Sequence, residues 1–162
     1  MRAILTAMMI VCCIMTGVAV ADPYEDGEAA YNAGQYGTAF QLFQPLAEQN
    51  DARAQLYLGL LYSEGDGVQK NPIQAVYWYR KAADQGHAGA QFYLGHMYLR
   101  GDGVAKDDML ALIWFSIAAG RGEAQAALVR DDLAKTLSPE QVADAERLAR
   151  DWKPNSGKPV GR

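Results

Sequence analysis

A 36-residue internal repeat constrains the fold of this chain more than any other feature of its sequence. When the sequence is shifted by 36 residues against itself, residues 52–87 match residues 88–123 at 17 positions. The same shift places parts of residues 29–51 on the second half of residues 52–87, which indicates an earlier copy with a divergent front half. A repeat of this length is one structural unit that buries its apolar surface only by stacking on its neighbours.

Each copy carries the sequence signals of two helices. In residues 52–87, apolar residues recur at helical spacing on one face, and Gly65 stands where a helix commonly ends in a left-handed residue. Asn71 and Pro72 then supply a capping residue and a first residue for a second helix, which Gly86 ends. The repeat therefore predicts an all-α solenoid of two and a half to three helix pairs.

Residues that recur with the repeat are expected to be structural. Tyr62 and Tyr98 form one such pair, and Trp78 and Trp114 form another. Both pairs keep their identity between copies and are predicted to lie in the core. Gly59 recurs in the next copy as well, which predicts close helix contact, because only a missing side chain lets two backbones approach.

The first 21 residues form a segment unlike the rest of the chain. Arg2 is its only charge, and an apolar run follows from Ala3 to Ala21. A positive start, an apolar middle and small residues at the end predict a secretory signal peptide that is removed after Ala21. A retained membrane anchor is the alternative, because a run of this length nearly spans a bilayer.

Removal of that segment changes the chemistry available to the chain. It takes away Cys12 and Cys13, so the mature chain has no thiol, no disulfide and no cysteine-based zinc site. Arg2 is lost from the 15 Lys and Arg residues, and the remaining 14 face 19 Asp and Glu residues, for a net charge of about −5. Such a chain is a poor partner for nucleic acid or an anionic membrane surface. We expect it in the periplasm or outside the cell, without stable membrane insertion.

Shorter signals flank the two clear copies. Residues 28–33 and 36–49 predict a helix pair, and residues 123–135 predict a helix after the last copy. Ser138 and Gln141 match a capping box, which starts a final helix over the open end of the core. The predicted organisation is a signal peptide at 1–21 and a repeat domain at 22–152, with repeats at about 29–51, 52–87 and 88–123, a capping helix pair at 124–152 and a disordered tail at 153–162.

The two clear copies carry a recognisable motif. The string A-x-x-x-L-G-x-x-Y-x-x-G-x-G-V spans Ala54 to Val68 and again Ala90 to Val104. It resembles the Sel-one-like repeat (SLR) family, a relative of the tetratricopeptide repeat with a longer loop inside each pair. The resemblance implies a curved, right-handed superhelix that holds protein or peptide partners. Some exported members are cysteine-rich, with a disulfide in each repeat, and this chain departs from them.

The sequence contains no recognisable catalytic or metal-binding motif. His87 and His96 are nine residues apart, which is not the i, i+4 spacing of a metal pair. The G-D-G strings at 65–67 and 101–103 lack the further residues of a phosphate or calcium loop, so they predict turns with left-handed glycines. The few serines lie in neither G-x-S-x-G nor S-x-x-K. We therefore expect a protein that is not an enzyme and that binds no cofactor or metal.

A further set of residues lies on the flank of each first helix, beside its apolar face. In successive copies these positions hold Arg53, Tyr57, Leu60 and Glu64, and then Gly89, Tyr93, His96 and Arg100. Only the tyrosine keeps its identity, whereas a core position should stay alike from copy to copy. Tyr and Arg are favoured as anchors at interfaces. The candidate partner-binding residues are therefore Arg53, Tyr57, Glu64, Tyr93, His96 and Arg100. A solvated flank is the alternative.

Two functions from different classes follow. The first is a non-catalytic adaptor of the cell envelope that binds a protein or peptide partner in the repeat groove. The second is β-lactam binding or hydrolysis, by analogy with the cysteine-rich relatives of the family. The sequence offers no visible nucleophile for that second activity.

Overall fold

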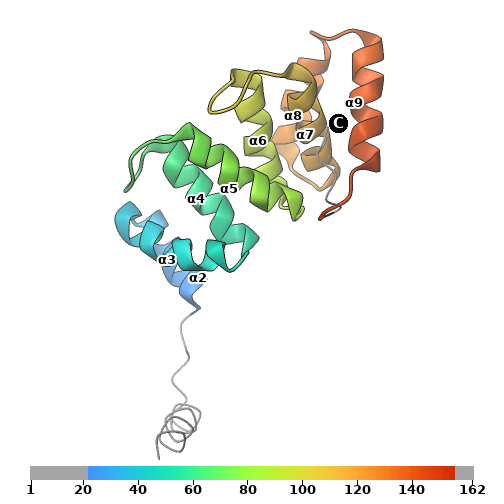
Figure 1. The fold of residues 1–162 in the computed structure, drawn as a ribbon. Helices are drawn as coiled ribbons and strands as arrows, with labels where there is room; N and C mark the ends of the chain where they lie inside the picture. The colour runs from blue at the N-terminus through green and yellow to red at the C-terminus, as the bar shows by residue number, and fades with distance from the viewer. Residues whose placement is uncertain (1–21, 156–162) are drawn as a thin grey trace, which may run out of the picture.

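The computed structural model of the protein describes residues 22–155, and this part of the chain is all-helical (Figure 1). Within this range there are eight helices and no strand. Their bounds are α2 Pro23–Asn32, α3 Tyr36–Glu48, α4 Ala52–Glu64, α5 Pro72–Asp84, α6 Ala88–Arg100, α7 Asp108–Gly120, α8 Ala124–Ala134 and α9 Pro139–Asp151. The predicted signal peptide and residues 156–162 of the predicted tail lie outside the described residues.

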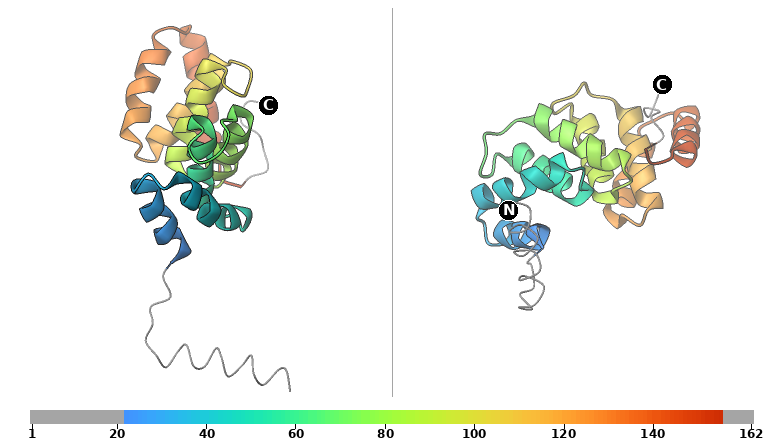
Figure 2. Two further views of the ribbon diagram at one scale, coloured as in Figure 1. Left: turned by 90° about the vertical axis from the view of Figure 1, so that its left-hand side faces the viewer. Right: turned by 60° about the horizontal axis from the view of Figure 1, so that its bottom comes forward.

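The helices form a solenoid in which each contacts mainly its neighbours along the chain. Packing is densest within the pairs α4/α5 and α6/α7, and the second helix of one pair packs on the first helix of the next. Figure 2 shows the pairs in a row that runs from α2 and α3 at one end to α8 and α9 at the other. The predicted all-α solenoid of stacked helix pairs is confirmed.

The helix caps of the two clear repeats have the predicted geometry. Asn71 and Asp107 hold the same position in successive repeats, and each side chain accepts a backbone N–H three residues later, at 3.1 and 2.9 Å. Gly65 and Gly101 end α4 and α6 in the left-handed conformation, with φ of 83° and 75°. The second glycine of each G-D-G string also has a positive φ, of 68°. The two strings are therefore the turns that the sequence predicted.

The glycines inside the first helices make room for aromatic rings. A Cβ atom on Gly95 would lie 2.8 Å from the Phe115 ring, and one on Gly59 would overlap the Tyr79 ring. Tyr79 and Phe115 hold the same position in α5 and α7, and both are buried. The predicted close contact is confirmed, with one correction: a ring of the second helix, and not its backbone, occupies the space.

Three of the four recurring aromatic residues lie in the core. Trp78, Tyr98 and Trp114 have exposed fractions of 9%, 6% and 1%. Tyr62 is half-buried, and its ring meets that of Phe40 edge-on with centroids 5.6 Å apart. Because Tyr62 packs against both core clusters without being enclosed by either, the core prediction needs correction at this position.

The first helix begins earlier than the repeat pattern predicted. It starts at Pro23 and not near Glu28, because Asp22 is its N-cap and accepts the backbone N–H of Tyr24 at 3.0 Å. Proline at the first position of a helix costs nothing, since that N–H has no partner within the helix. The 36-residue period does not extend to this segment, so the repeat carried no signal for it.

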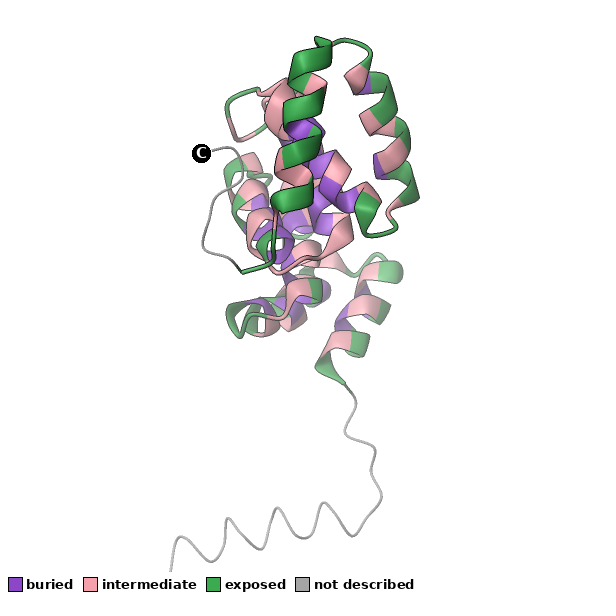
Figure 3. Ribbon diagram, turned by 90° about the vertical axis from the view of Figure 1, so that its right-hand side faces the viewer, coloured by how far each residue is buried: buried purple, intermediate pink, exposed green. Residues whose placement is uncertain are grey.

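The last two helices do not form a pair like the others. α9 packs on α7 and makes few contacts with α8, and Figure 3 shows α8 and α9 standing apart at this end with buried residues of α7 between them. The predicted capping box starts α9: Ser138 N–H donates to Gln141 Oε1 at 2.9 Å, and Gln141 N–H donates to Ser138 Oγ at 3.2 Å. The expected helix pair is therefore present, but its two members are splayed.

The chain after α9 turns back onto the solenoid. The Trp152 ring meets that of Trp114 edge-on, with centroids 6.0 Å apart. Asn155 N–H then donates to the backbone oxygen of Asp84, at the end of α5, at 2.8 Å. Residues 153–155, which the sequence placed in a disordered tail, are therefore part of the packed structure.

Candidate functional site

The first helices of the three repeats carry half-buried tyrosines on one face. α2 provides Tyr24 and Tyr31, α4 provides Tyr57 and α6 provides Tyr93. The Tyr57 ring meets Tyr31 edge-on with centroids 4.9 Å apart, and it meets Tyr24 at 6.1 Å. We name the surface formed by these four side chains the tyrosine face.

Tyr57, a candidate from the sequence, is held by its neighbours. Its ring stacks on that of Phe43, with centroids 4.5 Å apart and 7° between the planes. Its hydroxyl donates to Glu28 Oε1 at 2.9 Å. Burial, followed by this hydrogen bond to a carboxylate, raises the pKa of the Tyr57 hydroxyl well above its ordinary value. Tyr57 therefore joins the first two repeats as well as lining the face.

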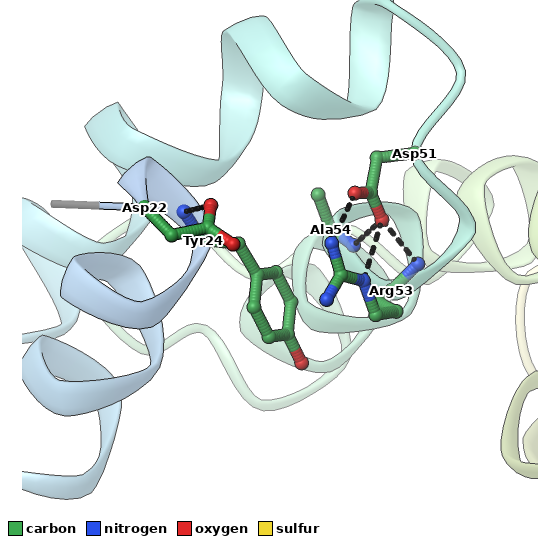
Figure 4. A network of polar contacts seen from close by, with 5 residues as sticks. All are labelled: Asp22, Tyr24, Asp51, Arg53 and Ala54. Atoms are coloured by element: carbon green, nitrogen blue, oxygen red, sulfur yellow. Dashed lines mark hydrogen bonds and ion pairs between the residues drawn. The ribbon is translucent and has the colours of Figure 1, made fainter. Parts of the chain in front are cut away.

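Arg53, another candidate, lies at the edge of the same face. Figure 4 shows Asp51, the N-cap of α4, accepting hydrogen bonds from the Arg53 side chain and from the backbone N–H groups of Arg53 and Ala54. Burial opposes ionisation of Asp51, but these hydrogen bonds outweigh it and lower the pKa of the carboxyl. The guanidinium also lies over the Tyr24 ring, with Cζ 3.9 Å from the centroid. Arg53 thus links the start of α4 to α2.

Tyr93 and His96 lie on α6 among further aromatic rings. Tyr93 stacks on Tyr79 of α5, with centroids 5.4 Å apart and 13° between the planes. His96 contacts Phe92 and Phe115 edge-on, at 4.6 and 5.0 Å. Burial, and then the charge of nearby Arg100, lowers the pKa of His96. We conclude that His96 is a neutral aromatic side chain at pH 7.

Glu64 and Arg100 are exposed residues at the same position of successive repeats, at the ends of α4 and α6. Burial raises the pKa of Tyr31, and Tyr93 and Glu64 are among the ionisable neighbours that raise it further. Groups from α2, α4 and α6 are therefore close enough to influence one another. The tyrosine face therefore has contributions from three repeats, and exposed charges of both signs stand beside it.

The structure divides the six predicted residues into two groups. Arg53 and Tyr57 lie together beside α2, while Tyr93, His96 and Arg100 lie on α6, and Glu64 is the last residue of α4. Four residues of this region were not predicted: Tyr24 and Tyr31, which belong to the tyrosine face, and Glu28 and Phe92, which contact the predicted residues Tyr57 and His96.

Two features of the sequence explain why these residues were not predicted. Three of them lie in α2, which is out of phase with the 36-residue period. The Asp22-Pro23 pair is the one local signal that marks this helix. Phe92 replaces Leu56 of the preceding repeat, so it resembled an ordinary apolar position.

No group of three or more His, Cys, Asp or Glu side chains in residues 22–155 is arranged to hold a metal ion. None of the helices in the same range is long and apolar enough to cross a membrane.

The fold consists of stacked helix pairs, and the tyrosine face is formed by the first helices of these pairs. These two features define a helical-repeat scaffold. The family model for the Sel1 repeat matches residues 24–51, 52–87 and 88–123. The chain therefore belongs to the Sel1 repeat family, whose members are generally protein-interaction modules. A search of curated proteins gave no match.

Solved structures of Sel1-type repeat proteins are similar to this chain. The chain is similar to c5321, a protective antigen of uropathogenic Escherichia coli strains with an SLR fold, at a TM-score of 0.71 and 26% identity. That match covers 86% of this chain and 34% of the antigen, so the chain spans about a third of its length. It is also similar to a Sel1 repeat protein from Oxalobacter formigenes, at a TM-score of 0.62 and 34% identity, covering 68% of this chain and 86% of that one.

Proposed function

We propose that this protein is a non-catalytic adaptor of the cell envelope that binds a protein or peptide partner on the tyrosine face. The observation that carries the proposal is the row of half-buried tyrosines contributed by three consecutive first helices. Tyrosine offers a large contact area at a low cost in side-chain entropy, together with a hydroxyl that can hydrogen-bond, and it is enriched at binding hot spots.

The charges around the face support a segment of mixed polarity as the partner. Arg53, Glu64 and Arg100 are exposed at its edges, whereas the tyrosine rings are partly covered. Exposed charges at a rim contribute mainly to the rate and the selectivity of association, and desolvated aromatic rings contribute more of the affinity. The exposed charges are therefore the right places to test binding without disturbing the packing of Tyr57 or Tyr93.

The test is site-specific photo-cross-linking in the intact envelope. A photoreactive amino acid is placed at Glu64 or Arg100 on the tyrosine face, and at Arg147, an exposed residue of α9, as the control. We expect the same protein adduct from the first two positions and none from the third. Adducts from Arg147 alone, or from none of the three positions, would contradict the proposed location of binding.

The envelope location is a separate part of the proposal and has its own test. It is supported by the signal-peptide pattern of residues 1–21. We expect the protein in the periplasm or the medium to begin at Asp22, as measured by N-terminal sequencing after fractionation. A chain that keeps residues 1–21 and sediments with membranes would instead support a retained anchor.

A further inference from the structure

The splayed cap leaves a cleft between α8 and α9 whose floor is α7. Its outer part is a cavity of about 540 Å³ lined by Arg121, Arg130, Arg150, Trp152, Glu146 and Ser116. It exists because α9 packs on α7 and leaves α8 largely uncovered on that side. These helices differ from those of the tyrosine face, so a function of the cleft does not depend on the function proposed for that face.

Positive charge exceeds negative charge around this cavity. Arg130 pairs with Asp131 at 2.7 Å, and Arg150 approaches Glu146 at 3.7 Å, which is a long separation for an ion pair. Arg121 makes no ion pair with the described residues, and its guanidinium lies over the Trp152 ring, 5.1 Å from the centroid. The lining of this cavity thus includes three arginines and one carboxylate, in a chain that is acidic as a whole.

The floor of the cleft holds a polar group with no partner. Ser116 borders both the outer cavity and the next one inward, and its buried Oγ atom makes no hydrogen bond with the described residues. A buried hydroxyl without a partner costs free energy, and this one meets a ligand only after its side chain turns toward the cavity.

The far end of the cleft is apolar. The adjoining cavity, of about 210 Å³, shares Ser116, Arg130 and Glu146 with the outer one and adds Leu112, Val142 and Asp131, the ion-pair partner of Arg130. A third cavity, of about 450 Å³, continues past Val142 to Leu137 and Pro139. A ligand lying in the whole cleft would therefore meet arginines at one end and aliphatic side chains at the other.

We propose that this cleft binds a peptide segment in which an acidic group follows an apolar side chain. The acidic group lies among Arg121, Arg130 and Arg150, because a guanidinium donates two parallel N–H bonds to a carboxylate. The apolar side chain lies against Val142, which lines both the adjoining cavity and the apolar third one. The segment that follows Asn155 in this chain carries Lys158 and Arg162 and no Asp or Glu, so charge disfavours it as the occupant.

Isothermal titration calorimetry with synthetic peptides tests this proposal. The probes are acetyl-Ala-Leu-Asp with a free carboxyl end, acetyl-Ala-Leu-Asn-amide of the same size without charge, and inorganic phosphate. We expect the acidic peptide to bind at least about tenfold more tightly than the neutral one, since charge-assisted bonds are roughly twice as strong as neutral ones. Phosphate bound as tightly as the acidic peptide would overturn the assignment to a peptide in favour of a free anion.

A double variant and a control locate the binding. Arg121→Gln with Arg150→Gln is expected to weaken the acidic peptide at least about tenfold. Arg147 is an exposed arginine of α9, the helix that carries Arg150, and it pairs with Asp144. Arg147→Gln is expected to leave the affinity for the acidic peptide unchanged. Urea unfolding of each variant verifies that it is folded. Failure of the acidic peptide to bind the parent protein, or equal binding by all variants, would overturn the proposal.

Discussion

Glycine in the middle of a helix destabilises it by about 1 kcal/mol relative to alanine. Gly59 and Gly95 occur there because the rings of Tyr79 and Phe115 lie on the helix backbone at those positions. In the first repeat Gly27 has the same relation to the ring of Phe43. At the residue scale, each repeat is closed by a ring of the second helix resting on a glycine of the first.

The first prediction concerns this contact. Gly95→Ala is expected to destabilise the protein by about 1–3 kcal/mol, because the added methyl group forces the Phe115 ring to move in a packed core. Gly120→Ala is the control, since Gly120 is also helical and a Cβ there meets nothing within 4 Å. That variant should be neutral or stabilising by up to about 1 kcal/mol. Urea unfolding measures both, and equal stabilities would refute the role given to the ring.

The second prediction concerns acid sensitivity. His87 is the N-cap of α6, and its Nδ1 accepts the backbone N–H of Ala90 at 3.3 Å, which requires a neutral ring. Burial lowers the pKa of His87 below its ordinary 6.5. The unfolded chain therefore binds a proton first as the pH falls, so stability is full above about pH 6.5 and is lost below it.

His87→Asn keeps a capping acceptor that does not titrate. Between pH 7 and pH 5, its melting temperature should fall less than that of the parent. His96, whose pKa is also lowered by burial, accounts for the remaining sensitivity. Parallel melting curves for parent and variant across this range would show that the cap is not responsible.

At the scale of elements, each long loop of the solenoid rests on the start of the preceding second helix. A Cβ atom on Gly67 would collide with the backbone of Tyr36 and Gly37 in α3, and one on Gly103 would collide with the backbone of Pro72 and Ile73 in α5. The positions correspond with a shift of 36 residues. The loops therefore fix how one repeat sits on the previous one.

Gly103→Ala tests this loop contact against a matched glycine. It adds backbone strain at φ of 68° and a collision with α5, so we expect a loss of at least about 3 kcal/mol. Gly34→Ala adds only the strain, because φ is 72° there and a Cβ meets nothing within 4 Å, and we expect a loss of about 1–2 kcal/mol. Equal losses in denaturant unfolding would mean that the loop contributes strain alone.

The helices that follow the repeat were predicted from the sequence. The prediction failed where contacts between distant residues determine the structure. Gly65, Asn71 and Asp107 act as predicted, since caps and left-handed turns depend on neighbours along the chain. Gly27 and the start of α2 were missed. Gly27 contacts a ring as the glycines of the later repeats do, and α2 is a helix like theirs, but neither lies at the 36-residue spacing.

Of the tyrosine face, the sequence predicted the two tyrosines that follow the repeat, Tyr57 and Tyr93, but not their partners. The contact of Tyr57 with Tyr31 and Glu28 joins residues of two helices, and no period along the chain reports it. The arginine cleft was missed for the same reason. The cleft exists because α9 packs on α7 and makes few contacts with α8. This is tertiary packing, which no repeat along the sequence reports.

At the scale of the whole molecule, the buried side chains form two clusters. The smaller one joins α2, α3 and α4 and reaches Trp78 of α5, while the larger one extends from α5 to α9. α7 contributes the most to the larger cluster, with seven of its 13 residues buried, whereas α2 has only Gly27 and Ala30 buried. In repeat proteins stability is roughly a sum of such local terms, so the two ends can open separately.

Amide hydrogen exchange measured by mass spectrometry tests this division. We expect peptides from α2 to exchange first and those from α7 to exchange last, under conditions in which the protein stays folded. An α2 peptide protected as strongly as one from α7 would show that residues 22–155 unfold as a single unit.

The contact of each loop glycine with the preceding second helix has a consequence for how such a chain can grow. Residues 88–123 contain the loop glycine that contacts α5. In α7 they also contain the positions that correspond to the residues of α5 which this glycine contacts. A tandem duplication of this segment would create one junction that the protein does not contain, between α7 and a second copy of α6, at positions that correspond to the present α5/α6 junction. Gene duplication in whole units can therefore lengthen the solenoid when one junction of an existing type is adapted.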